Sequence, residues 1–145
     1  MNECVRKLDP GEAATAAALI QSFHSRAVSE AHLSNLLSDS ANVLLVAELA
    51  AQVVGFAYAH WLDRLARERQ HLFLYEIEVD SRHQRKGIGR ELMNAILVEA
   101  RSKQADVFVF TNHSNARAVS FYESMGGVAK NGDDLLFVYQ YDGAT

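Results

Sequence analysis

The most informative stretch of the chain is residues 75–93, YEIEVDSRHQRKGIGRELM. Its first five residues alternate as in a strand, and its last six begin a helix with a regular apolar stripe. A basic turn with glycines at positions 87 and 89 joins the two. Glycine lets a ligand approach the backbone closely, and the first N–H groups of a helix have no partner within it. With Arg85 and Lys86 beside them, these amides predict a binding site for a pyrophosphate group.

The turn differs from two common phosphate-binding motifs. It lacks the G-x-x-x-x-G-K-[S/T] pattern of nucleoside triphosphate sites, and the dinucleotide pattern needs a third glycine where this chain has Leu92. Taken alone, the basic residues also fit a solvated loop in front of a helix, because clusters of surface charge are common. The turn by itself therefore leaves both interpretations open.

On either side of this stretch the pattern predicts an α/β (α+β) fold, with a mixed, mostly antiparallel sheet of about seven strands and helices on both faces. Helices are expected to begin at Asp9, Ser29, Ile88 and Asn115. We expect residues 1–145 to form a single domain, because no repeat or linker interrupts them. Strands are expected at residues 4–8, 43–48, 53–62, 72–79, 107–110, near Val128 and at 135–141, the last two joined by a hairpin turn at Asn131-Gly132.

The composition excludes several classes of protein. The 145 residues are 49% hydrophobic and 22% charged with a net charge of −4, which is typical of a folded domain and not of a disordered chain. No apolar run reaches the roughly 18 residues of a membrane span. The first residues also lack the apolar core of a secretory signal, so we expect a cytoplasmic protein with no membrane partner. A single cysteine, Cys4, allows no intrachain disulfide, and the six histidines lack metal-ligand spacing, so no metal is expected.

Two motifs resemble one family. Residues 84–89, Gln-Arg-Lys-Gly-Ile-Gly, look like the Q/R-x-x-G-x-G/A signature of the GNAT N-acetyltransferase superfamily, in which backbone amides hold the pyrophosphate of acetyl-CoA. Residues 111–126 resemble the family's N-x-x-A-x-x-x-Y-x-x-x-G helix. The predicted order of elements is also that of the family, and the resemblance covers residues 43–141. Gly127 departs from it, since many members have an aromatic residue there, and this puts the local packing in question.

The resemblance implies a set of cofactor-binding residues. The backbone of Ile77 and Val79 would pair with the pantetheine arm of acetyl-CoA, and Asn115 would hydrogen-bond the cofactor. Tyr122 would lie close to the cofactor's sulfur atom. The signature turn would hold the pyrophosphate and the second motif would border the cofactor; these residues are Gln84, Arg85, Lys86, Gly87, Ile88, Gly89 and Arg90 in the turn and Ala118, Phe121 and Tyr122 in the helix.

Acetyl transfer from a thioester to an amine needs a base and an acid at neutral pH, because an alkylammonium has a pKa of about 10 and a thiol of about 8.5. Glu76 and Glu78 lie about 7 Å apart on one strand face, together with Leu72 and Leu74. Without the resemblance, an ordinary half-exposed strand is the better interpretation. With it, we expect both glutamates to attract an ammonium group, with Glu78 the first candidate for the general base and Glu76 the second. A bulge, which the family has here, would change their relative aim.

Two further roles complete the predicted chemistry. Tyr122 is the candidate general acid, although its spacing alone fits a core tyrosine on an amphipathic helix. The backbone amide of Val79 is the candidate donor to the developing oxyanion. Cys4 lies on the first strand, away from the motifs, and is interpreted as a small packed hydrophobe. A covalent acetyl-cysteine route is therefore disfavoured, and we expect direct attack in a ternary complex.

The acceptor amine is inferred from a closer resemblance. The chain length, the strand LYEIEV and the segment FVYQY at 137–141 look most like the type I aminoglycoside 3-N-acetyltransferases. Such polycationic substrates suit Glu76 and Glu78, together with Asp133 and Asp134, whose hairpin borders the acceptor pocket in this family. Alternative acceptors are a small metabolic amine, a polyamine or a peptide.

Two other classes of function remain as alternatives. A non-catalytic acetyl-CoA-binding module would not need Glu78 or Tyr122, and both are present. A nucleic-acid binder would carry a broad basic face, whereas the basic residues here are local and the net charge is negative, so no nucleic-acid partner is expected. A two-fold homodimer is the default expectation for the family.

Overall fold

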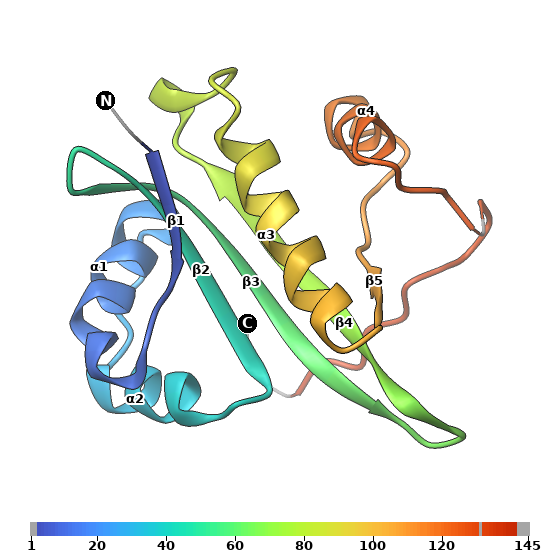
Figure 1. Ribbon diagram of the computed structural model, residues 1–145, viewed down its shortest axis with the longest axis horizontal. Coiled ribbons are helices and arrows are strands. Elements are labelled where there is room, and N and C mark those ends of the chain that lie inside the picture. The colour runs from blue at the N-terminus through green and yellow to red at the C-terminus, as the bar shows by residue number, and fades with distance from the viewer. Residues whose placement is uncertain (1–2, 131, 142–145) are drawn as a thin grey trace. The chain divides into compact units, whose positions relative to one another are not determined.

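The structure of the protein is a computed structural model that describes residues 3–130 and 132–141. The chain divides into two compact units, residues 1–110 and residues 111–145, and the single domain predicted from the sequence stays a prediction. The described part of the second unit contains one helix, α4 (Ala116–Ser124). The first unit contains, in order, β1 (Glu3–Lys7), η1 (Pro10–Glu12), α1 (Ala13–His24), α2 (Glu30–Ser38), β2 (Asn42–Leu49), β3 (Gln52–Arg64), β4 (Arg67–Val79), η2 (Ser81–His83), α3 (Ile88–Ser102) and β5 (Asp106–Phe108) (Figure 1).

The first unit is built on one five-stranded sheet with the strand order β1-β2-β3-β4-β5. Neighbouring strands from β1 to β4 run antiparallel, and β5 is parallel to β4. The predicted mixed, mostly antiparallel sheet is therefore confirmed. β3 and β4 extend farther than predicted, because the charged residues 63–69 continue both strands to the exposed tip of their hairpin.

The predicted count of seven strands is wrong, since the described residues form five. The sequence predicts two further strands near Val128 and at residues 135–141, around a turn whose first residue, Asn131, lies outside the described residues. Residues 128–130 and 132–141 contain no strand, and their large apolar side chains are exposed; Leu136 is 88% exposed. These residues have strand propensity, but a strand also needs a partner backbone, and the two arms form no ladder with each other.

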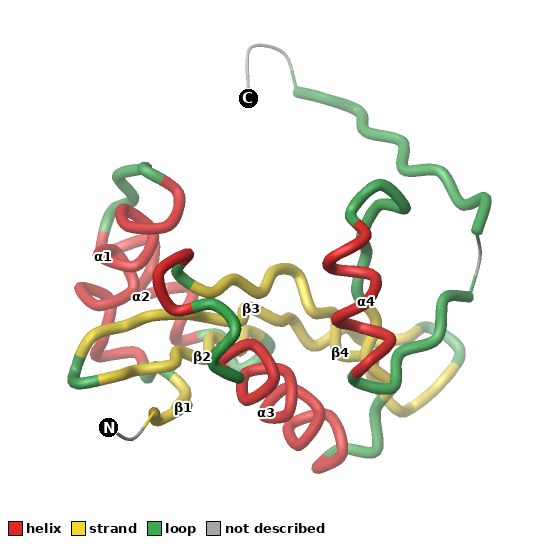
Figure 2. The backbone as a smooth tube through the Cα atoms, turned by 90° about the horizontal axis from the view of Figure 1, so that it is seen from above, coloured by secondary structure: helices red, strands yellow, loops and turns green. Residues whose placement is uncertain are grey.

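Helices cover both faces of the sheet, as predicted. Figure 2 shows α1 and α2 on one side of the strands and α3 on the other. The first layer packs Leu19 and Leu33 of the helices against Leu44 and Phe56 of the sheet in one buried cluster. The opposite layer is α3, which buries most of its predicted apolar stripe and leaves only Leu97 partly exposed; the buried residues are Ile88, Leu92, Met93, Ile96 and Ala100.

Local sequence signals fix the starts of the first helices. The Asp9 carboxylate accepts a hydrogen bond from the Gly11 N–H at 2.9 Å, and Glu12 accepts one from the Asp9 N–H at 3.0 Å. This is the predicted capping box, and it opens the short η1 turn that continues directly into α1. The Ser29 hydroxyl accepts from the His32 N–H at 3.1 Å and begins α2.

Cys4 differs from the prediction, because its side chain is exposed and not packed. It lies on β1, which among the described strands pairs with β2 alone and so forms an edge, and its partner across the ladder is the charged residue Glu48. An edge strand buries less of its surface than a central one, so a small thiol there is not enclosed.

α3 approaches the sheet closely at Gly55 in β3. A Cβ atom at this position would lie 3.0 Å from the backbone oxygen of Glu78, 3.2 Å from Leu92 Cδ1 and 3.4 Å from Ile88 Cγ2. Gly55 also pairs with Val79, the last residue of β4. The missing side chain therefore allows the first turns of α3 to pack directly on the ends of β3 and β4.

Replacing Gly55 with alanine should test this packing. We expect the free energy of unfolding to fall by about 1–3 kcal/mol, because the added methyl group must displace backbone as well as side chains. Urea unfolding measures the change, and Gly132→Ala is the matched control, since a Cβ at Gly132 meets nothing within 4 Å. Equal stability of the two variants would contradict the close approach of α3.

Candidate active site

A β-bulge lies just before the two predicted carboxylates. Tyr58 of β3 pairs with Glu76, but the next residue, Ala59, pairs with Leu74. Tyr75 is therefore an extra residue in β4 with no partner of its own in the ladder. The bulge predicted from the family resemblance is present, and it changes the side to which the following residues point.

The bulge separates the carboxylates from the apolar part of β4. Glu78 lies opposite Phe56, which belongs to the buried cluster under α1, so Glu78 faces α1. Leu74 lies opposite Ala59, and Ala59 follows the α1-facing Tyr58, so Leu74 faces α3. The predicted common face of the leucines and the glutamates is therefore wrong, because the extra residue lies between them.

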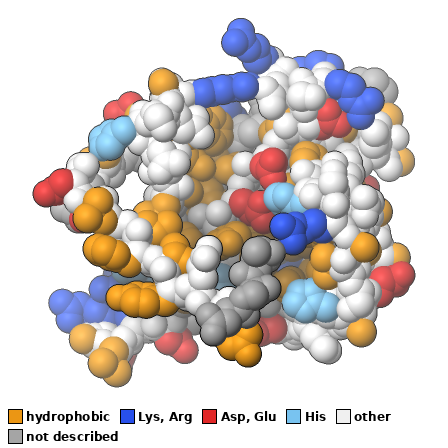
Figure 3. Space-filling model, turned by 180° about the vertical axis from the view of Figure 1, so that it is seen from behind, with side chains coloured by type: hydrophobic (Ala, Val, Ile, Leu, Met, Phe, Trp, Pro, Cys, Tyr) orange, Lys and Arg blue, Asp and Glu red, His pale blue; other side chains and the backbone are white. Residues whose placement is uncertain are grey.

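On the α1 side both carboxylates meet His24, the last residue of α1. Its Nε2 lies 3.0 Å from a carboxylate oxygen of Glu76 and 3.5 Å from one of Glu78. These three side-chain atoms all lie within 4.8 Å of one another. The ring of Phe56 packs edge-on against His24, with 6.1 Å between the ring centroids. We call His24, Glu76 and Glu78 the acidic cluster. On the face seen in Figure 3, acidic side chains lie next to a histidine and a basic side chain.

The surroundings of Glu78 suit proton transfer. Burial raises the pKa of the Glu78 carboxyl, the neighbouring Glu76 raises it further, and His24 lowers it. The side chains of Glu76 and Glu78 are 29% and 42% exposed, so each still reaches solvent. A carboxylate with a raised pKa is a better proton acceptor near neutral pH than an ordinary glutamate.

Beyond the bulge, no described strand lies along the outer edge of β4. β5 pairs with β4 over three residues only, all before the bulge. The Asp80 N–H donates to the Val54 carbonyl of β3 at 2.8 Å, so by alternation the N–H and C=O groups of Ile77 and Val79 point away from β3. The Val79 carbonyl accepts from the Gln84 side-chain amide at 3.2 Å. Pairing of the Ile77 and Val79 backbone with a pantetheine arm stays a prediction.

Asp80 holds the turn that follows β4. Its carboxylate accepts from the Arg82 backbone N–H at 2.9 Å and pairs with the Arg82 guanidinium at 3.0 Å. The side-chain and backbone hydrogen bonds from Arg82 lower the pKa of the Asp80 carboxyl to about 2. Arg82 is thus part of the turn itself, and the exposed side chains of Arg85 and Lys86 supply positive charge at its surface.

Two residues of the predicted pyrophosphate turn have a left-handed backbone. The φ angle is +83° at Gly87, the N-cap of α3, and +63° at Arg85. Such an angle costs a non-glycine residue about 1–2 kcal/mol, and strained residues gather at functional sites. No side chain of the N-cap bonds to the first turn of α3, whose leading amides have no partner within the helix. Such a backbone is compatible with anion binding, and the pyrophosphate site stays a prediction.

The second unit holds the remaining predicted residues. Asn115 caps α4, where its side-chain oxygen accepts from the Ala118 N–H at 3.1 Å. Tyr122 is partly buried beside Phe121, with 5.4 Å between the ring centroids. Burial raises the pKa of the Tyr122 hydroxyl. The cofactor contacts of these residues and the role of Tyr122 stay predictions.

The departure at Gly127 now has a structural reason. Its N–H donates to the Tyr122 carbonyl at 2.9 Å, and a Cβ atom would lie only 2.9 Å from that same oxygen. The aromatic residue that many family members have here cannot fit this conformation. Asp133 and Asp134 lie exposed in the loop that follows, and their predicted contact with the acceptor stays a prediction.

Sequence reasoning missed His24 as a site residue. The six histidines lack metal-ligand spacing along the chain, and the histidine weighed as a possible base was His113, interpreted as a solvated loop residue. The absence of a metal stays a prediction. His24 reaches the acidic cluster through the packing of α1 on the sheet, which no local motif encodes. One weak signal exists: Phe23, beside it, belongs to the apolar stripe of α1, and its ring lies 5.1 Å from that of Phe56.

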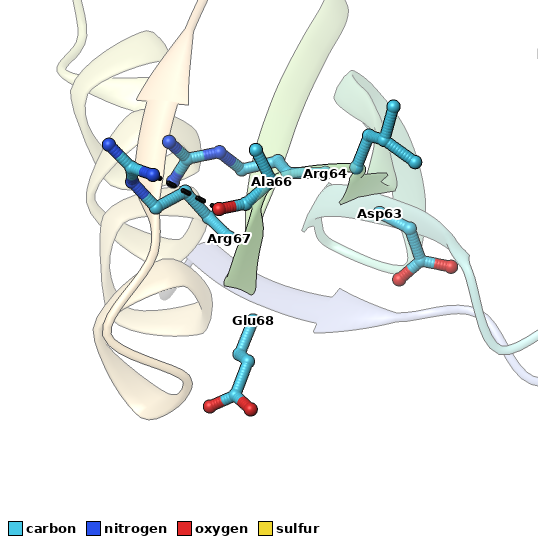
Figure 4. Close-up of a pocket in the computed structure, with 6 residues that line it drawn as sticks. Asp63, Arg64, Ala66, Arg67 and Glu68 are labelled. Atoms are coloured by element: carbon cyan, nitrogen blue, oxygen red, sulfur yellow. Dashed lines mark hydrogen bonds between the residues drawn. The ribbon is translucent and has the colours of Figure 1, made fainter.

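A second concave region lies at the tip of the β3–β4 hairpin. Figure 4 shows that it is lined by residues of that hairpin, and the lining residues are the consecutive positions 63–68. Asp63 and Glu68 point in different directions there and do not converge on a common point. We therefore assign the candidate active site to the end of β4 and not to this hollow.

Comparison with known proteins identifies the family. Residues 13–127 match the model of the acetyltransferase (GNAT) family, which is most of the chain. The chain belongs to the GNAT acetyltransferase family. Human (Homo sapiens) N-acetyltransferase 8 is 32% identical over 104 residues, a match that covers 71% of this chain. The chain spans 45% of the length of that relative.

Solved structures share the GNAT fold. The aminoglycoside acetyltransferase meta-AAC0020 from an uncultured soil metagenomic sample, solved with trehalose, is 23% identical, with a TM-score of 0.86 and 97% of each chain covered. The ribosomal-protein-alanine N-acetyltransferase of Brucella melitensis biovar Abortus 2308 is 20% identical, with a TM-score of 0.76, and covers 97% of this chain and 100% of its own. At these identities the likeness establishes the fold. None of the helices in the described ranges is both long and apolar enough to cross a membrane.

Replacing Gly87 with valine tests the anion-binding turn. We expect affinity for coenzyme A to fall at least about tenfold, because a β-branched residue cannot hold the left-handed φ angle and the turn amides would rotate away. Isothermal titration calorimetry measures the affinity. Gly126→Val, at a second positive φ of +90°, gives the stability cost of such a change by itself. Unchanged coenzyme A affinity in a folded Gly87→Val protein would exclude the turn as the pyrophosphate site.

Proposed function

We propose that this chain is an N-acetyltransferase that moves the acetyl group of acetyl-CoA to a primary amine by direct attack in a ternary complex. The observation that carries the proposal is the pair of partly buried carboxylates at the end of β4, next to a backbone edge that no described strand covers. A module that only bound acetyl-CoA would have no use for two acids at this point.

The residues around this edge fit acetyl-CoA, which supplies an acetyl group activated as a thioester. Ile77 and Val79 direct backbone groups toward the edge, where the amides of a pantetheine arm would pair with them. The turn from Gln84 to Arg90 combines helix-terminal amides with cationic side chains and would hold the pyrophosphate. In the second unit Asn115, Ala118, Phe121 and Tyr122 would border the cofactor, as the resemblance implies.

Glu78 would act as the general base. An amine attacks only when it is neutral, so its ammonium form must first lose a proton. Glu76 and Glu78 would attract the ammonium, and Glu78, whose pKa is raised by burial, would take the proton directly or through water. Glu76 remains the second candidate for the base.

Tyr122 would act as the general acid toward the departing thiolate. Because burial raises the pKa of its hydroxyl, Tyr122 stays protonated at neutral pH and keeps a proton to donate. The Val79 N–H, which points away from β3, would stabilise the developing oxyanion. No step requires Cys4, which lies exposed on β1.

For the acceptor we propose an aminoglycoside, modified at its 3-amino group. The acidic cluster supports a polycationic substrate, because adjacent carboxylates favour several ammonium groups. Asp133 and Asp134 would add two further charges. The aminoglycoside acetyltransferase meta-AAC0020, solved also with sisomicin at a TM-score of 0.84 and 22% identity, supports the same choice. A small metabolic amine, a polyamine or a peptide is the alternative acceptor.

The proposed function is tested by following the thiol released from acetyl-CoA across a panel of aminoglycosides, polyamines and peptides. We expect turnover with aminoglycosides to exceed that with the other amines, with the 3-amino group acetylated in the product as read by NMR. Turnover with polyamines or peptides only would replace the proposed acceptor and keep the reaction. Binding of acetyl-CoA without turnover on any amine would favour the non-catalytic module.

Glu78→Gln should lower kcat by about 10²–10⁴-fold and leave the affinity for acetyl-CoA unchanged, because only the base is lost. The wild-type kcat/KM should rise with pH through an acidic limb, since activity requires the carboxylate form. That limb should lie above the ordinary glutamate range of about 4.3, because the pKa of Glu78 is raised. Steady-state rates from about pH 5 to about pH 9 measure both effects.

Two variants serve as comparisons in the same assay. Glu68→Gln changes an exposed glutamate near the other end of β4 and should leave the pH profile as in the wild type. Tyr122→Phe should lower kcat but keep the acidic limb, since it removes the acid and not the base. An acidic limb that survives in Glu78→Gln would remove Glu78 from the role of base.

A further inference from the structure

Glu76 and Glu78 lie close enough for their carboxylates to repel each other, and His24 is placed to offset this repulsion. The two carboxylates approach each other in the acidic cluster, where like charges repel and favour the uptake of a proton by one of them. A carboxyl group that already holds this proton could not act as the base that the proposed function requires. The cluster therefore needs a donor that favours the carboxylate form of both acids.

His24 is placed to supply that donor. Its Nε2 faces both carboxylates, at 3.0 Å from Glu76 and 3.5 Å from Glu78. His24 is the last residue of α1, and Ser25, with φ of +53°, ends the helix directly after it. The imidazole thus lies at the carbonyl end of a helix with two carboxylates within reach of one ring nitrogen, so an N–H donor at this position complements the negative charge of both acids.

The packing of α1 fixes the ring. Phe56 contacts His24 edge-on from β3 and also contacts Phe23, the residue before it, at 5.1 Å between ring centroids. The His24 side chain is 33% exposed, so one side of the ring is open to solvent while its Nε2 is directed at the acids. A side chain held in this way can orient its partners, which a mobile surface histidine cannot.

We propose that His24 is a positioning residue of the acceptor site, whose Nε2 holds Glu76 and Glu78 side by side in their carboxylate forms so that Glu78 can accept a proton. This inference rests on the proposed function for the role of Glu78 as base. His24 itself forms no bond to the acetyl group or the acceptor. The proton balance is that of the base alone: the acceptor ammonium loses one proton and the Glu78 carboxylate gains it.

Other ionisable groups near the acidic cluster include tyrosine and aspartate side chains, which cannot supply a positive charge. Tyr58 faces it from β3, and burial raises the pKa of the Tyr58 hydroxyl, with smaller contributions from the charges of Asp39, at the end of α2, and Glu76. Tyr75 adds a further small contribution from β4. Tyrosine and aspartate side chains carry no positive charge and cannot offset the charge of the cluster, whereas His24 has a basic ring nitrogen within 3.5 Å of both acids.

His24→Leu tests the proposal, with His24→Gln as a variant that restores an N–H donor without an imidazole. We expect the acidic limb of the kcat/KM profile to move to higher pH by about one unit in His24→Leu. At pH values below the limb kcat/KM should then be roughly tenfold lower than in the wild type, and at pH values above it almost unchanged. The acidic limb of His24→Gln should lie at a pH between those of His24→Leu and the wild type. His32→Leu, a matched change on α2, should behave as the wild type. EDTA is present throughout so that no divalent cation takes the place of the missing side chain.

A second measurement separates this proposal from the proposed function. The side-chain carboxyl of Glu78 is titrated by carbon-13 NMR in the wild type and His24→Leu, without acetyl-CoA or amine. We expect the Glu78 titration to move to higher pH in His24→Leu. A Glu78 titration that does not move, or an activity loss equal at every pH, would overturn the role of His24. Absence of turnover in the wild type would reject the proposed function, and the NMR titration would still decide the role of His24.

Discussion

The extra residue in β4 is the constraint on which the site depends. Tyr75 has no partner in the ladder. The leucine side chains before it therefore face α3, and the glutamate side chains after it face α1. In a regular strand, Leu74 and Glu76 would share one face, and either a carboxylate would face α3 or a leucine would face the acidic cluster. The bulge therefore lets one strand place leucines in an apolar core before Tyr75 and carry the acidic cluster after it.

The same end of the sheet depends on how close α3 can come. Gly55 removes the side chain that would stand between β3, β4 and α3, and Gly87 and Arg85 adopt left-handed angles so that the chain can turn from β4 into the helix. Ile88 and Leu92, in the first turns of α3, thereby lie close to Gly55, and the backbone oxygen of Glu78 lies close to the same residue. In the proposed function, an anion site and a proton acceptor on adjoining backbone would position a phosphate-bearing thioester and an amine for acetyl transfer.

Local features of the fold follow from the sequence, whereas features set by packing do not. The capping residues Asp9 and Ser29 act over three residues, and the stripe of α3 reflects its own period, so both are predicted correctly. The segment 135–141 has the composition of a strand, but pairing depends on a partner that composition cannot supply. His24 joins the site because α1 packs on β3 and β4. Because His24 is far from Glu76 and Glu78 along the chain, no local sequence pattern predicts this contact.

The central claim is that the end of β4 and the glycine turn together bind acetyl-CoA, with its reactive end directed to the acidic cluster. A crystal structure of the protein with coenzyme A tests it most directly. We expect the pyrophosphate within hydrogen-bond distance of the amides of residues 85–89 and the pantetheine arm along Ile77 and Val79. Coenzyme A bound elsewhere, with this turn and this strand edge unoccupied, would show that the end of β4 is not the cofactor site.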